Sequence, residues 1–192
     1  VVELSIWYAD IELSASGNGT SWEEAFKTIQ EAINAADEDD EIWVKQGTYN
    51  LDSTIDVDKP VVMYAGFNGT ETQRNQRDWK TNVTIVDGQN AINHCFYFNA
   101  NVIIDGFTIT GGGTGVPGYS GGGIYVDSAS PIVAHCQFNG NNADYGGGIA
   151  NYQSSSTIVN CSFFDNSAAY GGGISNRQNS LSITTNCTFS EN

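Results

Sequence analysis

Three aspartates are the residues whose type and spacing best fit acid–base chemistry on a sugar. Asp87 and Asp105 each precede a glycine at the end of a predicted strand, 18 residues apart, and Asp127 ends a later strand. A glycoside hydrolase needs two or three carboxylates on neighbouring elements, so the hydrolase hypothesis stacks Asp87 on Asp105 with Asp127 nearby. The competing interpretation, which we favour, is that Asp-Gly is simply a turn sequence. The three aspartates are therefore weak catalytic candidates, and no catalytic residue is assigned.

A polysaccharide lyase would instead need a lysine or arginine that removes a proton beside a uronate carboxylate, together with an acidic Ca²⁺ site. Residues 121–192 contain a single basic residue, Arg177. This composition argues against lyase chemistry along that part of the chain. The sequence therefore leans towards a protein without enzymatic activity.

Cysteine recurs along the chain with a nearly constant spacing. Cys136 and Cys161 are 25 residues apart, and Cys187 follows one residue late. If these residues stack, their Cα atoms lie about one strand spacing apart, which is within the range of a disulfide. Two interpretations are open: buried free thiols that act as small apolar residues, which we favour, or one disulfide in an exported protein. Cys95 is expected on another face.

Metal, nucleic acid and membrane are poor partners for this sequence. His94 and His135 each precede a cysteine, but neighbouring strand residues point to opposite sides, so no metal site or cofactor is expected. The formal net charge of −15 is compatible with bound Ca²⁺, although solubility is the simpler reason for it. The same charge repels nucleic acid and anionic membranes, and no apolar run approaches the roughly 20 residues that a membrane-spanning helix needs.

A 25-residue repeat determines how these residues are positioned. Three blocks begin with Gly-Gly-Gly-Ile, at Gly121, Gly146 and Gly171. Other residues recur in step with the glycines, the last block carrying a one-residue insertion: Phe138, Phe163 and Phe189, then Asn141, Asn166 and Asn192. A fixed period of this length is typical of a repeat architecture.

Each block contains two short runs of β-branched and aromatic residues, separated by turn-forming residues, and shows no helical period. A unit this small cannot bury its own apolar face, but stacked copies make one continuous core. Identical residues then form ladders, in which asparagine amides bond from rung to rung, and glycine permits the sharp corners. The sequence therefore predicts an all-β fold, a right-handed parallel β-helix, or solenoid, with one coil per repeat.

The N-terminal part predicts the only helix. Ser21 and Glu24 have capping-box spacing. Apolar residues then follow on one helical face: Trp22, Ala25, Phe26, Ile29, Ala32, Ile33 and Ala36. A solenoid needs a lid over its first coil, so we interpret this helix as an N-terminal cap, with partner binding as the alternative.

The 192 residues predict one domain with three parts: a cap and first coil (1–50), irregular coils with long loops (51–120) and regular coils (121–192). Strands are expected at 6–9, 41–44, 55–57, 61–64, 83–88, 95–98 and 102–107, giving six or seven coils. The polar segment 66–82 contains Arg74, Arg77 and Lys80, and we expect Trp79 to pack it down while the arginines pair with acids. A glycine-rich loop with Pro117 spans 111–121.

Several segments together resemble a family of secreted bacterial and archaeal right-handed parallel β-helix proteins with the pectate-lyase-like fold. They include GTSWEEAF, EIWVKQGTY, GFNGTETQRNQRDW and VIIDGFTITGGG, and the likeness covers nearly the whole chain. The GGGI and FxxN repeats are similar to those of chlamydial polymorphic outer membrane proteins. Those repeats have alanine at the third position, where this chain has Gly123, Gly148 and Gly173. The resemblance implies an adhesive or structural role, or a carbohydrate-active one.

We therefore expect an extracellular or cell-surface structural or adhesive module, with a carbohydrate-active enzyme or glycan-binding module as the alternative. The start at Val1-Val2-Glu3 rather than methionine is compatible with a removed leader. The last coil lacks a polar cap, which predicts either a longer stalk or self-association through the open C-terminal coil. A regular Thr-X-Thr ladder, as in an ice-binding face, is absent. Five glycosylation sequons occur at a frequency close to chance: Asn18, Asn68, Asn82, Asn160 and Asn186.

Overall fold

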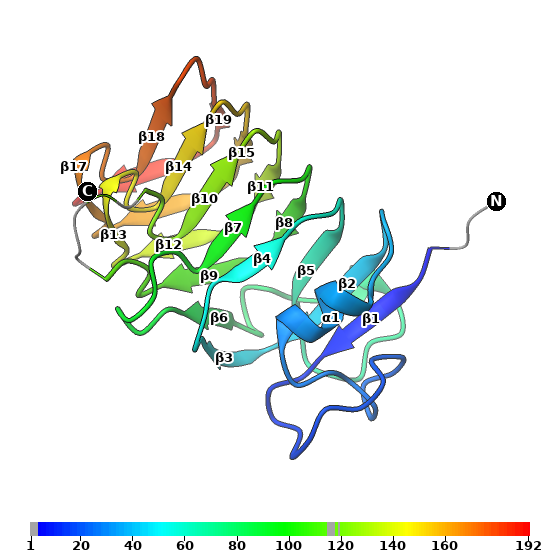
Figure 1. Ribbon diagram of the computed structural model, residues 1–192. Coiled ribbons are helices and arrows are strands. Elements are labelled where there is room, and N and C mark those ends of the chain that lie inside the picture. The colour runs from blue at the N-terminus through cyan, green and yellow to red at the C-terminus, as the bar shows by residue number, and fades with distance from the viewer. Residues whose placement is uncertain (1–3, 115–117, 119) are drawn as a thin grey trace.

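The computed structural model describes residues 4–114, 118 and 120–192, so the expectations for residues 1–3 and for Pro117 lie outside the described residues. The chain winds into coils whose strands stack in register, and every pairing between strands is parallel (Figure 1). The protein is a parallel β-helix with one N-terminal α-helix, as the repeat predicts. No helix in the described part of the chain is long and apolar enough to cross a membrane.

Four sheets make up the coils, and we name them A to D. Sheet A contains β1 (Ile6–Ala9), β2 (Glu41–Lys45), β5 (Val62–Phe67), β8 (Ile103–Asp105), β11 (Ile132–Ala134), β15 (Thr157–Val159) and β19 (Ile183–Thr185). Sheet B contains β3 (Gly47–Asn50), β6 (Thr84–Asp87), β9 (Phe107–Thr110), β12 (Gln137–Asn139), β16 (Ser162–Phe164) and β20 (Thr188–Ser190). Sheet C contains β4 (Ile55–Val57), β7 (Phe96–Phe98), β10 (Ile124–Asp127), β14 (Ile149–Tyr152) and β18 (Ile174–Arg177). Sheet D is the pair β13 (Asn142–Tyr145) and β17 (Ser167–Tyr170), and the seven strands of sheet A agree with six or seven coils.

A regular coil has more strands than the two predicted from each repeat. The run that leads to Phe163 is divided into β15 and β16, because Asn160 between them has a left-handed φ of 55°. Gly106, with φ 89°, divides the predicted strand 102–107 in the same way. Sheet D is a further strand pair in the polar segment after the phenylalanine. The prediction of two strands was wrong because a single left-handed residue makes a corner without any turn sequence.

The predicted ladders are confirmed inside the coils. Phe163 is fully buried, and its ring centroid lies 4.7 Å from those of Phe138 and Phe189 in the neighbouring coils. Ile149 pairs in register with Ile124 on one side and with Ile174 on the other. Identical side chains thus fill the core one above another.

The asparagine ladder satisfies its own amide groups. The Asn141 side-chain amide donates to the Asn166 carbonyl oxygen at 3.0 Å, and the Asn166 amide donates to Asn192 at 2.8 Å. Asn166 also donates to the backbone carbonyl of Phe138 at 3.0 Å. Burial of Asn141 and Asn166 is therefore compensated by hydrogen bonds.

The helix begins later than predicted. Helix α1 spans Ile29–Ala35, and its N-cap is Thr28 rather than Ser21. The Thr28 hydroxyl accepts from the backbone N–H of Glu31, whose carboxylate accepts in return from Thr28, which completes a capping box. A short 3-10 helix, η1 (Arg74–Gln76), is the other helical segment in the described residues.

Backbone pairing with β1 explains the late start of the helix. Phe26 donates its N–H to the Tyr8 carbonyl at 2.8 Å and accepts from the Asp10 N–H at 2.8 Å. Phe26 thus forms an isolated parallel bridge with Ala9 just before Thr28, and Ser21 only makes a local turn by accepting from the Glu24 N–H. The apolar spacing of the segment did not reveal this tertiary pairing.

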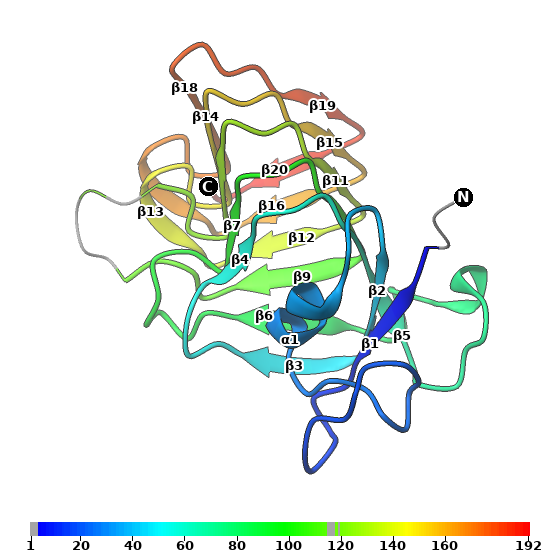
Figure 2. The same ribbon diagram turned by 45° about the vertical axis from the view of Figure 1, so that its right-hand side comes forward.

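Helix α1 forms a lid over the first coils. Its Ile29, Ala32 and Ile33 are buried in the same core as the strand residues. Figure 2 shows α1 across the N-terminal end of the coils, in front of the strands of sheet B. The apolar end of the solenoid is therefore covered on this side.

The long segment 66–82 is held against the body as expected. Trp79 packs so closely over Gly66 that a Cβ there would lie 2.5 Å from the Trp79 Cα. Arg74 pairs with Glu41 at 2.8 Å, and Arg77 pairs with Asp105 at 2.9 Å.

Candidate functional site

The outward face of sheet C is the candidate site. Strand residues alternate between the core and the outside, as the burial pattern of β7 and β10 shows. Phe96, Phe98, Ile124 and Val126 are buried, and the half-buried residues between them point outward. The outward positions carry three tyrosines and one of the predicted aspartates: Tyr97, Tyr125, Tyr152 and Asp127. We call these four residues the tyrosine face.

Two phenol rings stack at the centre of the tyrosine face. Tyr97 and Tyr125 pair in register, and their ring centroids are 5.6 Å apart with the planes 27° from parallel. The Tyr97 hydroxyl donates to the Asp127 carboxylate at 3.4 Å. Partial burial and the neighbouring Asp127 carboxylate raise the pKa of both phenols, so both remain protonated hydrogen-bond donors at neutral pH.

Sheet D flanks the tyrosine face with a second aromatic pair. Tyr145 and Tyr170 stack with ring centroids 4.9 Å apart and planes 11° from parallel. The guanidinium of Arg177 lies 3.7 Å from the centroid of the Tyr145 ring and donates to the Ser120 hydroxyl at 3.3 Å. Arg177 is next to Tyr152 in sheet C, so the single basic residue of 121–192 joins the two aromatic groups.

The three predicted aspartates lie on three different sheets. Asp127 ends β10 in sheet C, Asp87 ends β6 in sheet B and Asp105 ends β8 in sheet A. The expectation that Asp87 stacks on Asp105 was wrong, because Asp87 is paired in register with Thr110. A spacing of 18 residues is shorter than one full coil, so it carries the chain to another sheet. Asp87 instead accepts from the Gln89 N–H at 2.7 Å, which is a turn contact.

Asp105 is held in a polar cluster at the corner between sheets A and B. It pairs with Arg77 at 2.9 Å and with the Nδ1 atom of His135 at 3.1 Å. The indole of Trp79 lies between the other two partners, 4.7 Å from the His135 ring and 4.8 Å from the Arg77 guanidinium. The amide of Asn160 contacts Nε2 of His135 at 3.0 Å. Because Asp105 contacts both Arg77 of the segment 66–82 and His135 of the next coil, it anchors this segment to the coils.

A groove of about 410 Å³ lies beside this corner. Its lining is mostly polar and comes from the segment 66–82 and from three successive coils: Trp79, Lys80, His135, Cys136, Gln137, Asn160, Ser162 and Asn186. Asn160 and Asn186 are sequon asparagines, and the Asn186 amide donates to Asn160 at 2.6 Å.

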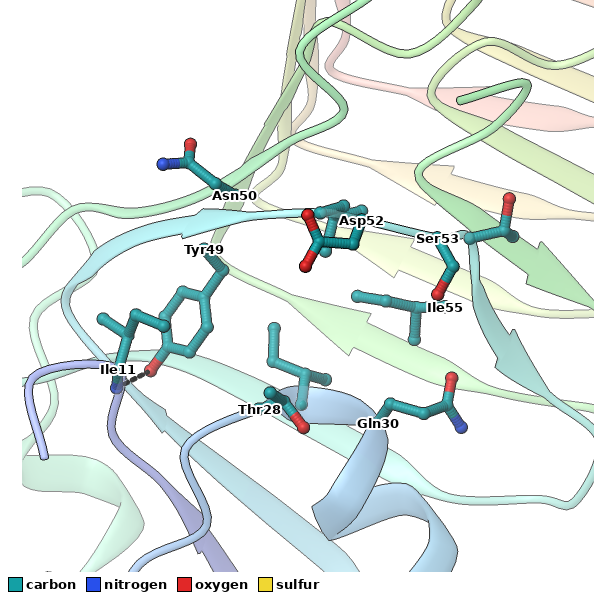
Figure 3. Close-up of a pocket in the computed structure, with 11 residues that line it drawn as sticks. Ile11, Thr28, Gln30, Tyr49, Asn50, Asp52, Ser53 and Ile55 are labelled. Atoms are coloured by element: carbon teal, nitrogen blue, oxygen red, sulfur yellow. Dashed lines mark hydrogen bonds between the residues drawn. The ribbon is translucent and has the colours of Figure 1, made fainter. Parts of the chain in front are cut away.

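A smaller pocket of about 230 Å³ lies under the N-terminal lid, between α1 and the turn from β3 to β4 (Figure 3). Tyr49 forms one wall, and its hydroxyl donates to the Ala9 carbonyl at 3.1 Å and accepts from the Ile11 N–H at 3.4 Å. Thr28 and Asp52 lie on opposite sides of the pocket. The Tyr49 hydroxyl thus makes its hydrogen bonds with backbone groups. We interpret the pocket as a gap between the lid and the first coil.

All four cysteines are free thiols, and three of them are buried. Among the described residues, no group of three or more His, Cys, Asp or Glu side chains is arranged around a common point that could hold a metal ion.

Sequence reasoning missed the tyrosine face and the role of His135. The signal for the tyrosines was the alternation in Ile-Tyr-Val-Asp, where apolar residues at positions 124 and 126 place Tyr125 and Asp127 outside. His135 carried no such signal, because its contact with Asp105 depends on which coils are neighbours.

Comparison with known proteins finds no match for this chain among protein families, curated proteins or solved structures.

Proposed function

We propose that this protein is an extracellular or cell-surface adhesive β-helix module that binds carbohydrate through the tyrosine face. The observation that carries the proposal is the stacked pair Tyr97 and Tyr125, with the Asp127 carboxylate beside it. Sites for small molecules are lined mostly by apolar and aromatic side chains, with a few polar groups that fix the orientation of the ligand. The resemblance to secreted pectate-lyase-like β-helices and to chlamydial surface proteins supports the same role.

The chemistry of the tyrosine face suits a chain of sugar hydroxyls. Tyr97 and Tyr125 stack in adjacent coils, and Tyr152 in the next coil lies in register with Asp127, so phenol hydroxyls from three coils act as donors and acceptors. Asp127 adds an acceptor, and Arg177 adds donors at the edge of the face. Binding is favoured over hydrolysis because the three candidate aspartates are on separate sheets, which leaves Asp127 without Asp87 or Asp105 beside it.

Binding to an oligosaccharide array, followed by calorimetry with the best ligand, tests this proposal. We expect Tyr97→Ala and Tyr125→Ala each to weaken binding by about tenfold or more, as loss of an aromatic contact at the centre of an interface does. Thr108→Ala is the matched control, because Thr108 lies between buried neighbours on the outward side of sheet B. Unchanged affinity in both tyrosine variants, or equal loss in the control, would count against the proposal. Parallel assays for released reducing ends and for a Ca²⁺ requirement address the enzymatic and Ca²⁺ alternatives.

End-to-end self-association is the second candidate function. β18, β19 and β20 each have a sheet neighbour on one side only, and the last coil exposes Leu181, Ile183 and Phe189. Such an edge can pair with a further coil. Light scattering of wild type and of Phe189→Ser tests whether that coil comes from a second copy. Concentration-dependent oligomers that Phe189→Ser abolishes support self-association, and a wild-type monomer at all concentrations rules it out for this chain.

A further inference from the structure

Cys136, Cys161 and Cys187 form a column inside the corner between sheets A and B. Each cysteine follows the left-handed corner residue of its coil, and the strands on both sides pair in register. Every thiol donates to the backbone carbonyl two residues earlier, at 3.2, 3.3 and 3.4 Å for Ala134, Val159 and Thr185. Since the same contact repeats in each coil, the sulfur atoms also repeat with the spacing of the strands, roughly 4.8 Å.

This spacing fits a metal bridge better than a disulfide. A disulfide brings two sulfur atoms to about 2.0 Å, so the column would have to be distorted by more than half of its spacing. Metal–thiolate bonds are about 2.3 Å long, and two of them in line span about 4.6 Å. A cation centred between two sulfur atoms of adjacent coils therefore needs almost no movement of the backbone.

We propose that Cys161 and Cys187 bind one soft monovalent d¹⁰ cation, Cu(I) or Ag(I), in a linear arrangement of sulfur, metal and sulfur. Thiolates select soft cations of this kind. A tetrahedral Zn²⁺ site needs four ligands, and no cluster of three or more suitable side chains occurs in the described residues. The column supplies only two sulfur atoms to any point between coils, which matches two-coordinate ions.

The surroundings favour this pair over Cys136 and Cys161. Cys187 is half-buried, whereas Cys136 and Cys161 are almost completely buried. Cys187 therefore provides the ligand that an arriving ion can reach, and Cys161 is its neighbour in the column.

Binding exchanges protons for the metal without a redox step. The S–H bonds of Cys161 and Cys187 break, two metal–sulfur bonds form, and two protons pass to solvent. The carbonyl oxygen of Ile158, 3.5 Å from the Cys187 sulfur atom, then faces the cation instead of a thiol proton. The site carries one net negative charge, which lies next to the partly solvated Cys187.

The test uses fully reduced protein and Cu(I) buffered by bicinchoninate under anaerobic conditions. We expect wild type to remove one equivalent of Cu(I) from the chelator, with release of two protons. Cys187→Ala and Cys161→Ala should weaken binding by about 100-fold or more, because one of only two ligands is lost. Cys136→Ala should keep one equivalent, and Cys95→Ala is the control for a buried thiol elsewhere in the fold.

A second measurement does not depend on how well the buried variants fold. In wild type, one equivalent of Ag(I) should slow alkylation of Cys187 by N-ethylmaleimide at least about tenfold, since the thiolate is the reactive form. No Cu(I) uptake by wild type, full uptake by folded Cys187→Ala, or alkylation of Cys187 at an unchanged rate would each overturn the proposal. X-ray absorption with more than two sulfur neighbours around Cu(I) would overturn the two-coordinate geometry. None of these outcomes bears on carbohydrate binding at sheet C, so the two proposals are tested separately.

Discussion

Residues 121–192 stack the same side chains from coil to coil, whereas residues 4–114 hold their coils with contacts that each occur once. In the first region, Phe163 contacts its own kind above and below, and so does Asn166. The second region uses a helix lid, an aromatic cluster around Trp43 and ion pairs such as Lys45 with Asp10 at 2.8 Å.

The difference reflects what each region must do. A coil in the middle of a solenoid only has to match its neighbours, so repetition is sufficient. The first coil has to end the core and carry the insertion 66–82, which requires contacts that no repeat supplies. We therefore expect the loss of stability on substitution to depend on rung position in the ladders. In the N-terminal region, we expect it to depend on the particular partner that each side chain loses.

The largest expected effect comes from the centre of the phenylalanine ladder. Phe163→Ala should lower the free energy of unfolding by about 3–5 kcal/mol, because it leaves a cavity between two rings. Phe189→Ala is the matched variant at the exposed rung and should cost about 1–2 kcal/mol. Urea denaturation of both variants measures this. Equal losses would show that the repeat region does not behave as a stack of rungs.

The ion pair that anchors segment 66–82 should have the next largest effect. Arg77→Ala leaves Asp105 without its guanidinium partner in a mostly buried corner, so we expect a loss of about 3 kcal/mol. Arg74→Ala, whose pair with Glu41 is more exposed, should cost less than about 1 kcal/mol. Thermal denaturation and proteolysis within 66–82 measure both, and similar losses for the two variants would refute the distinction.

The asparagine ladder should show an intermediate cost. Asn166→Ala removes hydrogen bonds to Asn141 and to the Phe138 carbonyl, which should cost about 2 kcal/mol. The exposed Asn142 serves as the control, and Asn142→Ala should change stability by less than about 0.5 kcal/mol. If chemical denaturation finds Asn166→Ala neutral, the amide ladder is not a source of stability.

The smallest expected effect tests where the helix begins. Thr28→Ala removes the N-cap and should cost about 1 kcal/mol. Ser21→Ala removes only a local turn contact and should cost less than about 0.5 kcal/mol. Circular dichroism during thermal unfolding compares the two, and a larger loss at Ser21 would restore the helix start that the sequence suggested.

The fold was predictable because the repeat leaves little choice. The 25-residue spacing of Gly121, Gly146 and Gly171 indicated one coil per block, and the ladders follow from it directly. The helix start was not predictable, since Ser21 and Glu24 carry a good capping pattern that backbone pairing of Phe26 with Tyr8 overrides.

The candidate site was predictable only in part. The sequence around Asp127 alternates in a way that places Asp127 on the outside with Tyr125. The sequence around Asp87 and Asp105 did not indicate that these residues lie in different sheets. The lengths of the loops between strands determine which strands become neighbours in the coils. Before Gly121 these lengths follow no fixed period. The contact of Asp105 with His135, 30 residues later, is a consequence of that arrangement.

Backbone amide shifts of ¹⁵N-labelled protein, recorded with and without the best-binding oligosaccharide, test the central claim most directly. Our account predicts that the perturbed amides lie in β7, β10 and β14, around Tyr97 and Tyr125, while sheet B stays unchanged. Perturbations confined to sheet B or to the groove beside His135, or none at saturating ligand, would contradict a carbohydrate site on the tyrosine face.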